Sequence, residues 1–120
     1  MNTSKKYDLE ERTYVFGKKI IELCQNTSQT LITNPIISQL IRSGTSIGAN
    51  YREANGASSK QDFRNKVFIC KKEAKETEYW LKMFLDCLPN KKIDIQLLSQ
   101  ECHELLLIFS KITISLNSKK

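Results

Sequence analysis

The apolar residues between Ser59 and Leu88 recur at alternating steps of four and three residues. Such a seven-residue repeat is typical of a helix packed lengthwise on other helices, whereas strands alternate with a period of two. A helix of this kind must bury its stripe, so the rest of the chain is expected to supply partner helices. The stripe consists of Phe63, Val67, Cys70, Ala74, Thr77, Leu81, Phe84 and Leu88.

Three further stretches carry stripes of about the same period, and together they predict an all-α four-helix bundle. They are Leu9, Thr13, Phe16, Ile20, Leu23 and Thr27; Ile37, Leu40, Gly44, Ile47, Tyr51 and Ala54; and Leu98, Cys102, Leu105, Phe109, Ile112 and Leu116. The predicted helices lie close to residues 8–28, 36–55, 59–88 and 95–117. Their connections are short, which favours antiparallel neighbours in an up-down-up-down order.

Capping residues predict where these helices begin and end. Asn34 is expected to cap the second helix, and Gly56 is expected to close it in the left-handed conformation. Ser58 and Gln61 form a predicted capping box at the start of the third helix, and Asp94 is expected to cap the fourth.

The length of 120 residues predicts a single domain, 1–120, with enough chain for one core. No segment approaches the roughly 20 apolar residues of a membrane span, and the polar start lacks an apolar signal core. We therefore expect a soluble, cytoplasmic protein without a membrane partner. The four cysteines form no C-x-x-C pair and are interpreted as reduced core residues, so no cofactor is expected.

Polar side chains lie beside the apolar stripes, or seams, of the second and third helices, on matching flanks. In an antiparallel pair of helices, equivalent flanks face each other. This would bring Asn50 near Lys66, Ser43 near Glu73, and Gln39 near Glu76. The members are Gln39, Arg42, Ser43, Ser46, Asn50 and Glu53 on the second helix, with Arg42 at the edge, and Asp62, Lys66, Ile69, Glu73, Glu76, Trp80 and Met83 on the third.

This polar flank has two interpretations. One is a solvated face with ordinary surface ion pairs, which contribute little energy. The other is a partly buried network that fixes helix register or forms a subunit contact. The presence of Trp80, Ile69 and Met83 among the charges favours the network.

A catalytic or metal-binding site is the weakest alternative for the flank. Glu53, Glu73 and Glu76 could act as paired carboxylates, but a di-metal bundle requires Glu-x-x-His pairs on facing helices. The one histidine, His103, forms no such pair. No phosphate-binding loop, nucleophile elbow or Cys/His cluster occurs in the sequence, so no catalytic residue and no metal site is predicted.

The fourth helix is apolar on more than one side. Besides its seam it carries Leu97, Leu106, Leu107, Ile108 and Ile114. A helix of a small monomeric bundle needs one apolar face, and a surplus leaves an exposed patch. We expect another copy of the chain to cover Leu106, Leu107, Ile108 and Ile114; the alternative is cover by loops and the N-terminal segment.

Basic residues follow the other flank of the third helix at Lys60, Arg64, Lys71, Lys75 and Lys82. Repeated around an oligomer, this stripe would form a surface suited to phosphate backbones. The alternative is a solvated lysine face of the kind that many helical proteins have. The net charge of +6 permits binding to polyanions without requiring it.

Two runs of sequence resemble the signatures of the 23S rRNA intervening-sequence (S23) family of small bacterial four-helix bundle proteins. They are QLIRSGTSIGANYREA at residues 39–54, and DFRNK at 62–66 followed by CKKEAKETEYWL at 70–81. The resemblance covers about residues 8–117. After Pro89 only the pattern of apolar and polar positions matches, without a specific motif. The residues that match the marked positions of the family are Arg42, Ser43, Ser46, Asn50, Glu53, Lys66, Glu73, Glu76 and Trp80.

The resemblance implies a left-handed up-down-up-down bundle that assembles as a ring, expected to be a homopentamer. Some relatives are encoded inside ribosomal RNA genes, and a related group serves retroelement reverse transcriptases as a basic accessory ring. No enzymatic activity is attributed to this fold. The sequence therefore predicts a non-enzymatic homo-oligomer that acts as a basic scaffold for RNA or DNA, beside a nucleic-acid enzyme. The alternative is a protein-interaction module that binds no nucleic acid.

Overall fold

Four long helices packed together make up the fold, in a computed structural model that describes the backbone of residues 5–118 and the side chains of residues 9–116. They are α1 (Lys5–Gln25), α2 (Thr33–Asn55), α3 (Lys60–Cys87) and α4 (Lys92–Ser118), with a short 3-10 helix, η1 (Pro89–Lys91), before α4. No strand occurs among the described residues. Residues 1–4 and 119–120 of the predicted domain lie outside them.

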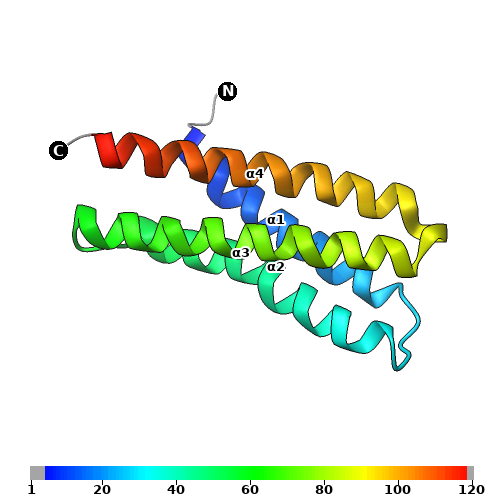
Figure 1. Cartoon of the computed structure of the whole chain (residues 1–120). Helices are drawn as coiled ribbons and strands as arrows, with labels where there is room; N and C mark the ends of the chain where they lie inside the picture. The colour runs from blue at the N-terminus through cyan, green and yellow to red at the C-terminus, as the bar shows by residue number, and fades with distance from the viewer. Residues whose placement is uncertain (1–4, 119–120) are drawn as a thin grey trace.

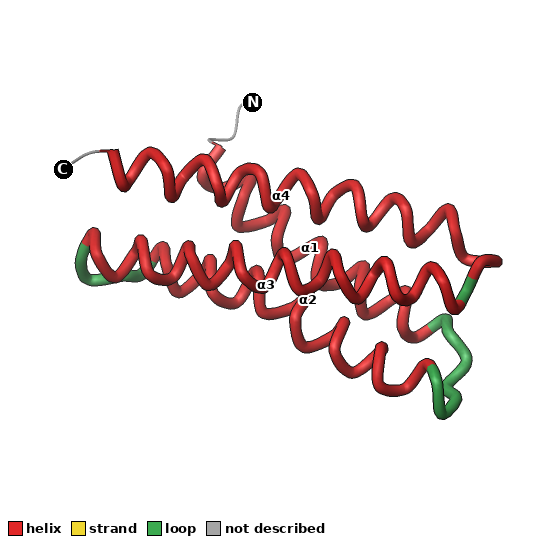
Figure 2. Tube along the Cα trace, viewed as in Figure 1, coloured by secondary structure: helices red, strands yellow, loops and turns green. Residues whose placement is uncertain are grey.

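The connections between the helices are short and lie at the two ends of the bundle (Figure 1). The α1–α2 and α3–α4 connections lie at one end, and the α2–α3 connection lies at the other (Figure 2). Within residues 5–118, no helix has a stretch long and apolar enough to cross a bilayer.

The core consists of the four predicted seams. Every member of the first two seams is buried, and only Phe63, Leu88, Ile112 and Leu116, at the ends of the other two, are partly exposed. The largest fully buried side chains are Phe16, Phe84 and Phe109. Burial of each such side chain contributes roughly 1.5–3 kcal/mol, so the seams account for how the helices associate.

The helix boundaries differ from the predictions by a few residues. Gly56 closes α2 as predicted, whereas the residues predicted to cap the starts of α2, α3 and α4 were wrong. At the start of α3 the Ser59 side chain accepts a hydrogen bond from the backbone N–H of Asp62, so the cap lies one residue beyond the predicted Ser58. Gly56 follows α2 with a φ of −98°, which is not left-handed. Because η1 leads directly into α4, that helix begins at Lys92 and Asp94 lies in its first turn.

The start of α2 is organised by threonine hydroxyls instead of Asn34. The helix begins at Thr33, and the hydroxyl of Thr30 accepts hydrogen bonds from the backbone N–H groups of Ile32 (3.2 Å) and Thr33 (3.0 Å). The buried Thr33 hydroxyl in turn donates to the Ser28 carbonyl over 2.7 Å. Local side-chain bonds of this kind satisfy the first amides of a helix, and they place Asn34 inside the first turn.

Helices α1 and α2 approach each other closely along glycines. A Cβ built on Gly44 would lie 3.0 Å from Cγ1 of Ile20, and one on Gly48 would lie 3.2 Å from the backbone of Thr13. A Cβ on Gly17 would lie 3.5 Å from the Cα of Thr45, which is an ordinary contact. Gly44 and Gly48 therefore set the distance between the two helices.

We expect Gly44→Ala to lower the free energy of unfolding by about 1–2 kcal/mol. The added methyl group would overpack a fully buried Ile20, at a cost of about 1–3 kcal/mol, and the better helix propensity of alanine offsets part of it. The matched control is Gly17→Ala, where the contact is ordinary and stability should rise by about 0.5–1 kcal/mol. Urea denaturation of the two variants checks this, and equal stabilisation by both would contradict it.

Candidate nucleic-acid interface

Helix α3 carries the predicted basic stripe along its surface. Lys60, Lys75 and Lys82 are exposed, and Arg64 and Lys71 are half-buried. The stripe is therefore accessible along the length of the helix, as a surface that contacts a phosphate backbone must be.

An aromatic ring outside the predicted stripes and flanks, that of Phe68, lies close to two of these cations. The guanidinium carbon of Arg64 lies 4.9 Å from the centre of the Phe68 ring, and Nζ of Lys71 lies 5.9 Å from it. Both distances are within the range of cation–π attraction, so the ring restrains the two cations at the surface. Phe68 follows Arg64 by four residues and precedes Lys71 by three, and this helical spacing was a signal that could have identified it.

Glu78 interrupts the stripe and faces α4. Its Oε2 lies 2.8 Å from Nδ1 of His103. This contact joins α3 to α4 next to the basic residues and engages the carboxylate that would otherwise oppose a bound phosphate.

The polar flank between α2 and α3 is organised around Arg42, which the sequence placed only at its edge. The Arg42 guanidinium donates to Glu73 over 3.2 Å and also bonds to Glu76, and its Nε donates to Gln39 over 3.1 Å. Nε1 of Trp80 donates to Glu76 over 3.4 Å. Glu73 is buried, although its partner Arg42 remains partly exposed.

These contacts change the protonation equilibria of the flank. The hydrogen bond from Arg42 holds the pKa of Glu76 below its ordinary value of 4.5. The same bond raises the pKa of Arg42. The Arg42–Glu76 pair is therefore charged across the physiological range.

A smaller polar contact lies in the buried seam under Arg42. The Thr77 hydroxyl lies 2.9 Å from the Ser43 hydroxyl and 2.8 Å from the Glu73 carbonyl. Ser43 also donates to the Gln39 carbonyl over 2.9 Å. The predicted proximity of Ser43 and Glu73 thus runs through Thr77, whose hydroxyl contacts both residues.

The remaining flank residues pair differently from the prediction. Lys66 donates to Glu53 over 2.8 Å instead of meeting Asn50. The Asn50 amide donates to the Ser46 carbonyl over 2.9 Å, and the Ser46 hydroxyl donates to the Arg42 carbonyl over 2.6 Å. Both bonds stay within α2, because short polar side chains in a helix reach carbonyls one turn earlier.

The candidate subunit-contact residues of α4 fall into two groups. Leu107 and Ile114 are 55% and 66% exposed. Leu106 and Ile108 are half-buried and pack against the core of their own bundle. The two exposed residues are therefore the ones that remain available to a neighbouring copy.

Three of the four cysteines are core residues and one is not. Desolvation raises the pKa of the Cys24 thiol to about 11 and the pKa values of Cys70 and Cys102 to about 12, so these thiols stay protonated. Cys87 is exposed, contrary to the prediction that the cysteines lie in the core. No group of three or more His, Cys, Asp or Glu residues that could hold a metal occurs within the described chain.

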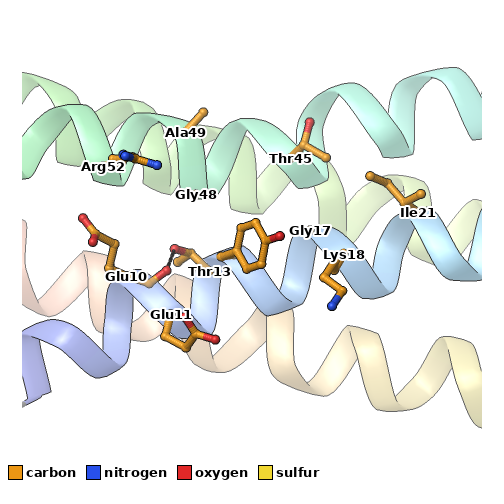
Figure 3. Close-up of a pocket in the computed structure, with 11 residues that line it drawn as sticks. Glu10, Glu11, Thr13, Gly17, Lys18, Ile21, Thr45, Gly48, Ala49 and Arg52 are labelled. Atoms are coloured by element: carbon orange, nitrogen blue, oxygen red, sulfur yellow. Dashed lines mark hydrogen bonds between the residues drawn. The ribbon is translucent and has the colours of Figure 1, made fainter. Parts of the chain in front are cut away.

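A surface groove between α1 and α2 was not anticipated from the sequence (Figure 3). It has a volume of about 900 Å³. Small residues of both helices line it, among them Gly17, Thr45, Gly48 and Ala49. The glycine and alanine positions were visible in the sequence, but the groove depends on how closely the two helices pack.

We expect Glu76→Gln to change how stability depends on pH. A carboxylate whose pKa is lowered by folding contributes stability above its ordinary pKa, and this contribution is lost as the pH falls through the folded-state value. The wild type should therefore lose stability below about pH 4.5, and Glu76→Gln should lose less. Urea denaturation between about pH 7 and pH 3 measures this.

Glu53→Gln is the control, because Glu53 also contacts a cation, Lys66, over 2.8 Å but is more exposed than Glu76. Its pH dependence should follow that of the wild type. An identical pH dependence for wild type and Glu76→Gln would contradict the role assigned to Arg42.

Comparisons with known proteins agree with this architecture. The family model of the 23S rRNA-intervening sequence protein matches residues 5–111. A crystal structure of a protein of unknown function from the S23 ribosomal protein family of Bacteroides thetaiotaomicron is 31% identical, with a TM-score of 0.78 over 88% of this chain and 97% of that one. No curated protein matches the chain significantly. The chain thus belongs to the 23S rRNA-intervening sequence protein family.

Proposed function

We propose that this protein is a non-enzymatic, homo-oligomeric scaffold that binds the phosphate backbone of RNA or DNA. The observation that carries the proposal is the basic stripe of α3, in which Arg64 and Lys71 both lie within cation–π distance of the Phe68 ring. Cations held in place at a surface lose less conformational freedom when they bind phosphate than freely rotating side chains do. The net charge of +6 adds long-range attraction to a polyanion.

Binding of this kind reads the backbone instead of the bases. The aromatic residues that could stack on bases lie mostly in the seams, and Phe68 is half-buried under its two cations. We therefore expect affinity to depend strongly on salt and weakly on sequence.

The assembly we propose is a ring of left-handed, antiparallel bundles, with five copies as the expected number, in the cytoplasm. The positions of the connections at the two ends of the bundle support the antiparallel order (Figure 1). The exposed side chains of Leu107 and Ile114 support association, because burying apolar side chains against another protein surface is favourable. A ring would repeat the α3 stripe and multiply the phosphate contacts, beside a nucleic-acid enzyme as the proposed partner.

A protein-interaction module is the second candidate function. Its support is the exposure of three side chains along α3, those of Ile69, Tyr79 and Met83. The Tyr79 ring packs edge-on against Trp80, with 5.0 Å between the ring centres. Aromatic residues and methionine are enriched in protein interfaces. In this case the charge of α3 would serve solubility alone.

We expect the triple variant Arg64→Glu, Lys71→Glu, Lys75→Glu to lose its binding to duplex DNA and structured RNA. For any binding that remains, the slope of log affinity against log salt should fall by about one unit per lost phosphate contact. Fluorescence anisotropy over a series of salt concentrations measures both quantities.

The control is Lys19→Glu, Lys72→Glu, Lys92→Glu, which changes the net charge equally at exposed positions off the stripe. It should retain most of the affinity. Equal loss in both variants would assign binding to net charge and not to the stripe. If the wild-type protein binds neither nucleic acid at low salt, the scaffold function is overturned in favour of the protein-interaction module.

A further inference from the structure

Helix α4 carries a second stripe with the seven-residue repeat, on the face away from its own core. Its members recur at steps of four and three residues, and every one of them is exposed. Four of the seven are large and apolar. The stripe consists of Ile93, Leu97, Gln100, Glu104, Leu107, Lys111 and Ile114. The same period places the seams of the bundle against other helices, so this face has the pattern of a helix that packs lengthwise on a partner.

The groove between α1 and α2 is a surface on which part of such a helix can lie. It runs along the two helices and has small residues where the helices meet, with exposed Tyr14 and Ile21 along its α1 side (Figure 3). Small residues in a groove allow close approach of a third helix, and apolar rims give that helix surface to bury.

The charges of the stripe and the groove match in spacing. Glu11 and Lys18 line the α1 side of the groove seven residues apart, with Tyr14 between them. Glu104 and Lys111 are also seven residues apart, with Leu107 between them. Each pair is separated by about 10.5 Å along its helix axis.

We propose that the outer stripe of α4 docks into the α1–α2 groove of a neighbouring copy, running antiparallel to that copy's α1. This inference rests on the homo-oligomer of the proposed function and identifies the two surfaces that join it. In this orientation Lys111 meets Glu11 and Leu107 packs on Tyr14. Glu104, which contacts Arg12 of its own chain over 3.1 Å, lies opposite Lys18 of the neighbouring copy. The opposite orientation would place Lys111 against Lys18 and Glu104 against Glu11, which is unfavourable.

The two surfaces are different, so each copy offers one stripe and one groove. A head-to-tail contact of this kind closes into a ring when the rotation between copies allows it. The basic residues of α3 belong to neither surface, so docking leaves them available to a nucleic acid.

A complementation experiment tests whether the contact joins two different surfaces. Leu107→Glu places a charge on the stripe, and Ala49→Trp fills the groove; each variant alone should be monomeric in sedimentation analysis. Mixed in equal amounts, they should form a dimer, because the groove of the first variant and the stripe of the second remain intact. A contact that used the stripe on both copies would leave Ala49→Trp associated on its own, and one that used the groove on both copies would leave Leu107→Glu associated on its own. Either outcome would overturn the proposal.

Controls separate a lost contact from a lost fold. Far-ultraviolet circular dichroism should show wild-type helicity for both variants. Leu31→Glu, in the exposed α1–α2 connection, should keep the wild-type mass. If Met83→Glu dissociates the assembly and Leu107→Glu does not, the contact lies on α3 and the inference fails while the proposed assembly stands. If the wild type is itself monomeric at high concentration, both fail.

A charge exchange tests the orientation. Glu11→Lys and Lys111→Glu should each weaken association about tenfold, because each brings like charges together. The double variant restores opposite charges and should associate within about threefold of the wild type. Additive weakening in the double variant would overturn the antiparallel orientation.

Discussion

Apolar side chains that recur every three or four residues are buried together between the four helices. This burial determines on which face of its helix each remaining residue lies. Once the seam of α3 is buried, the residues of the basic stripe must lie on one flank, and Glu73, Glu76 and Trp80 must lie on the other. The stripe that we assign to nucleic acid and the network around Arg42 are both consequences of that single constraint. A helix can present separate chemistry on each flank because the seam uses only part of its circumference.

The network around Arg42 shows how a buried carboxylate is accommodated beside an apolar seam. Glu73 is buried, yet Arg42 reaches it from a partly exposed position and also bonds to Glu76. Burying an unpaired carboxylate would be strongly unfavourable, so this pairing is a condition for packing α3 against α2. The Ser43 and Thr77 hydroxyls under it add directional contacts to a seam that apolar side chains alone would align less specifically.

The proposed functions depend on surfaces that the seams leave unused. On α4 a second stripe with the same period is exposed, and between α1 and α2 the close approach at Gly44 and Gly48 leaves a groove beside small residues. The interior packing that brings α1 near α2 thus also shapes the surface that we assign to a neighbouring copy. Association through these two surfaces would repeat the α3 stripe in each copy, which connects the core to the proposed binding of phosphate.

The sequence by itself determined the four helices, the members of their seams, the basic flank of α3 and the apolar surplus of α4. These features depend on the helical period, which assigns residues to faces whatever the helix packs against. Three features depend on how the helices pack: Thr30 and Ser59 organise helix starts, Arg42 lies at the centre of the flank, and a surface groove lies between α1 and α2. Periodicity gives the face of a residue but not the offset between neighbouring helices, and that offset selects which side chains meet. Lys66 therefore meets Glu53 and not Asn50, although all three lie on the predicted flank.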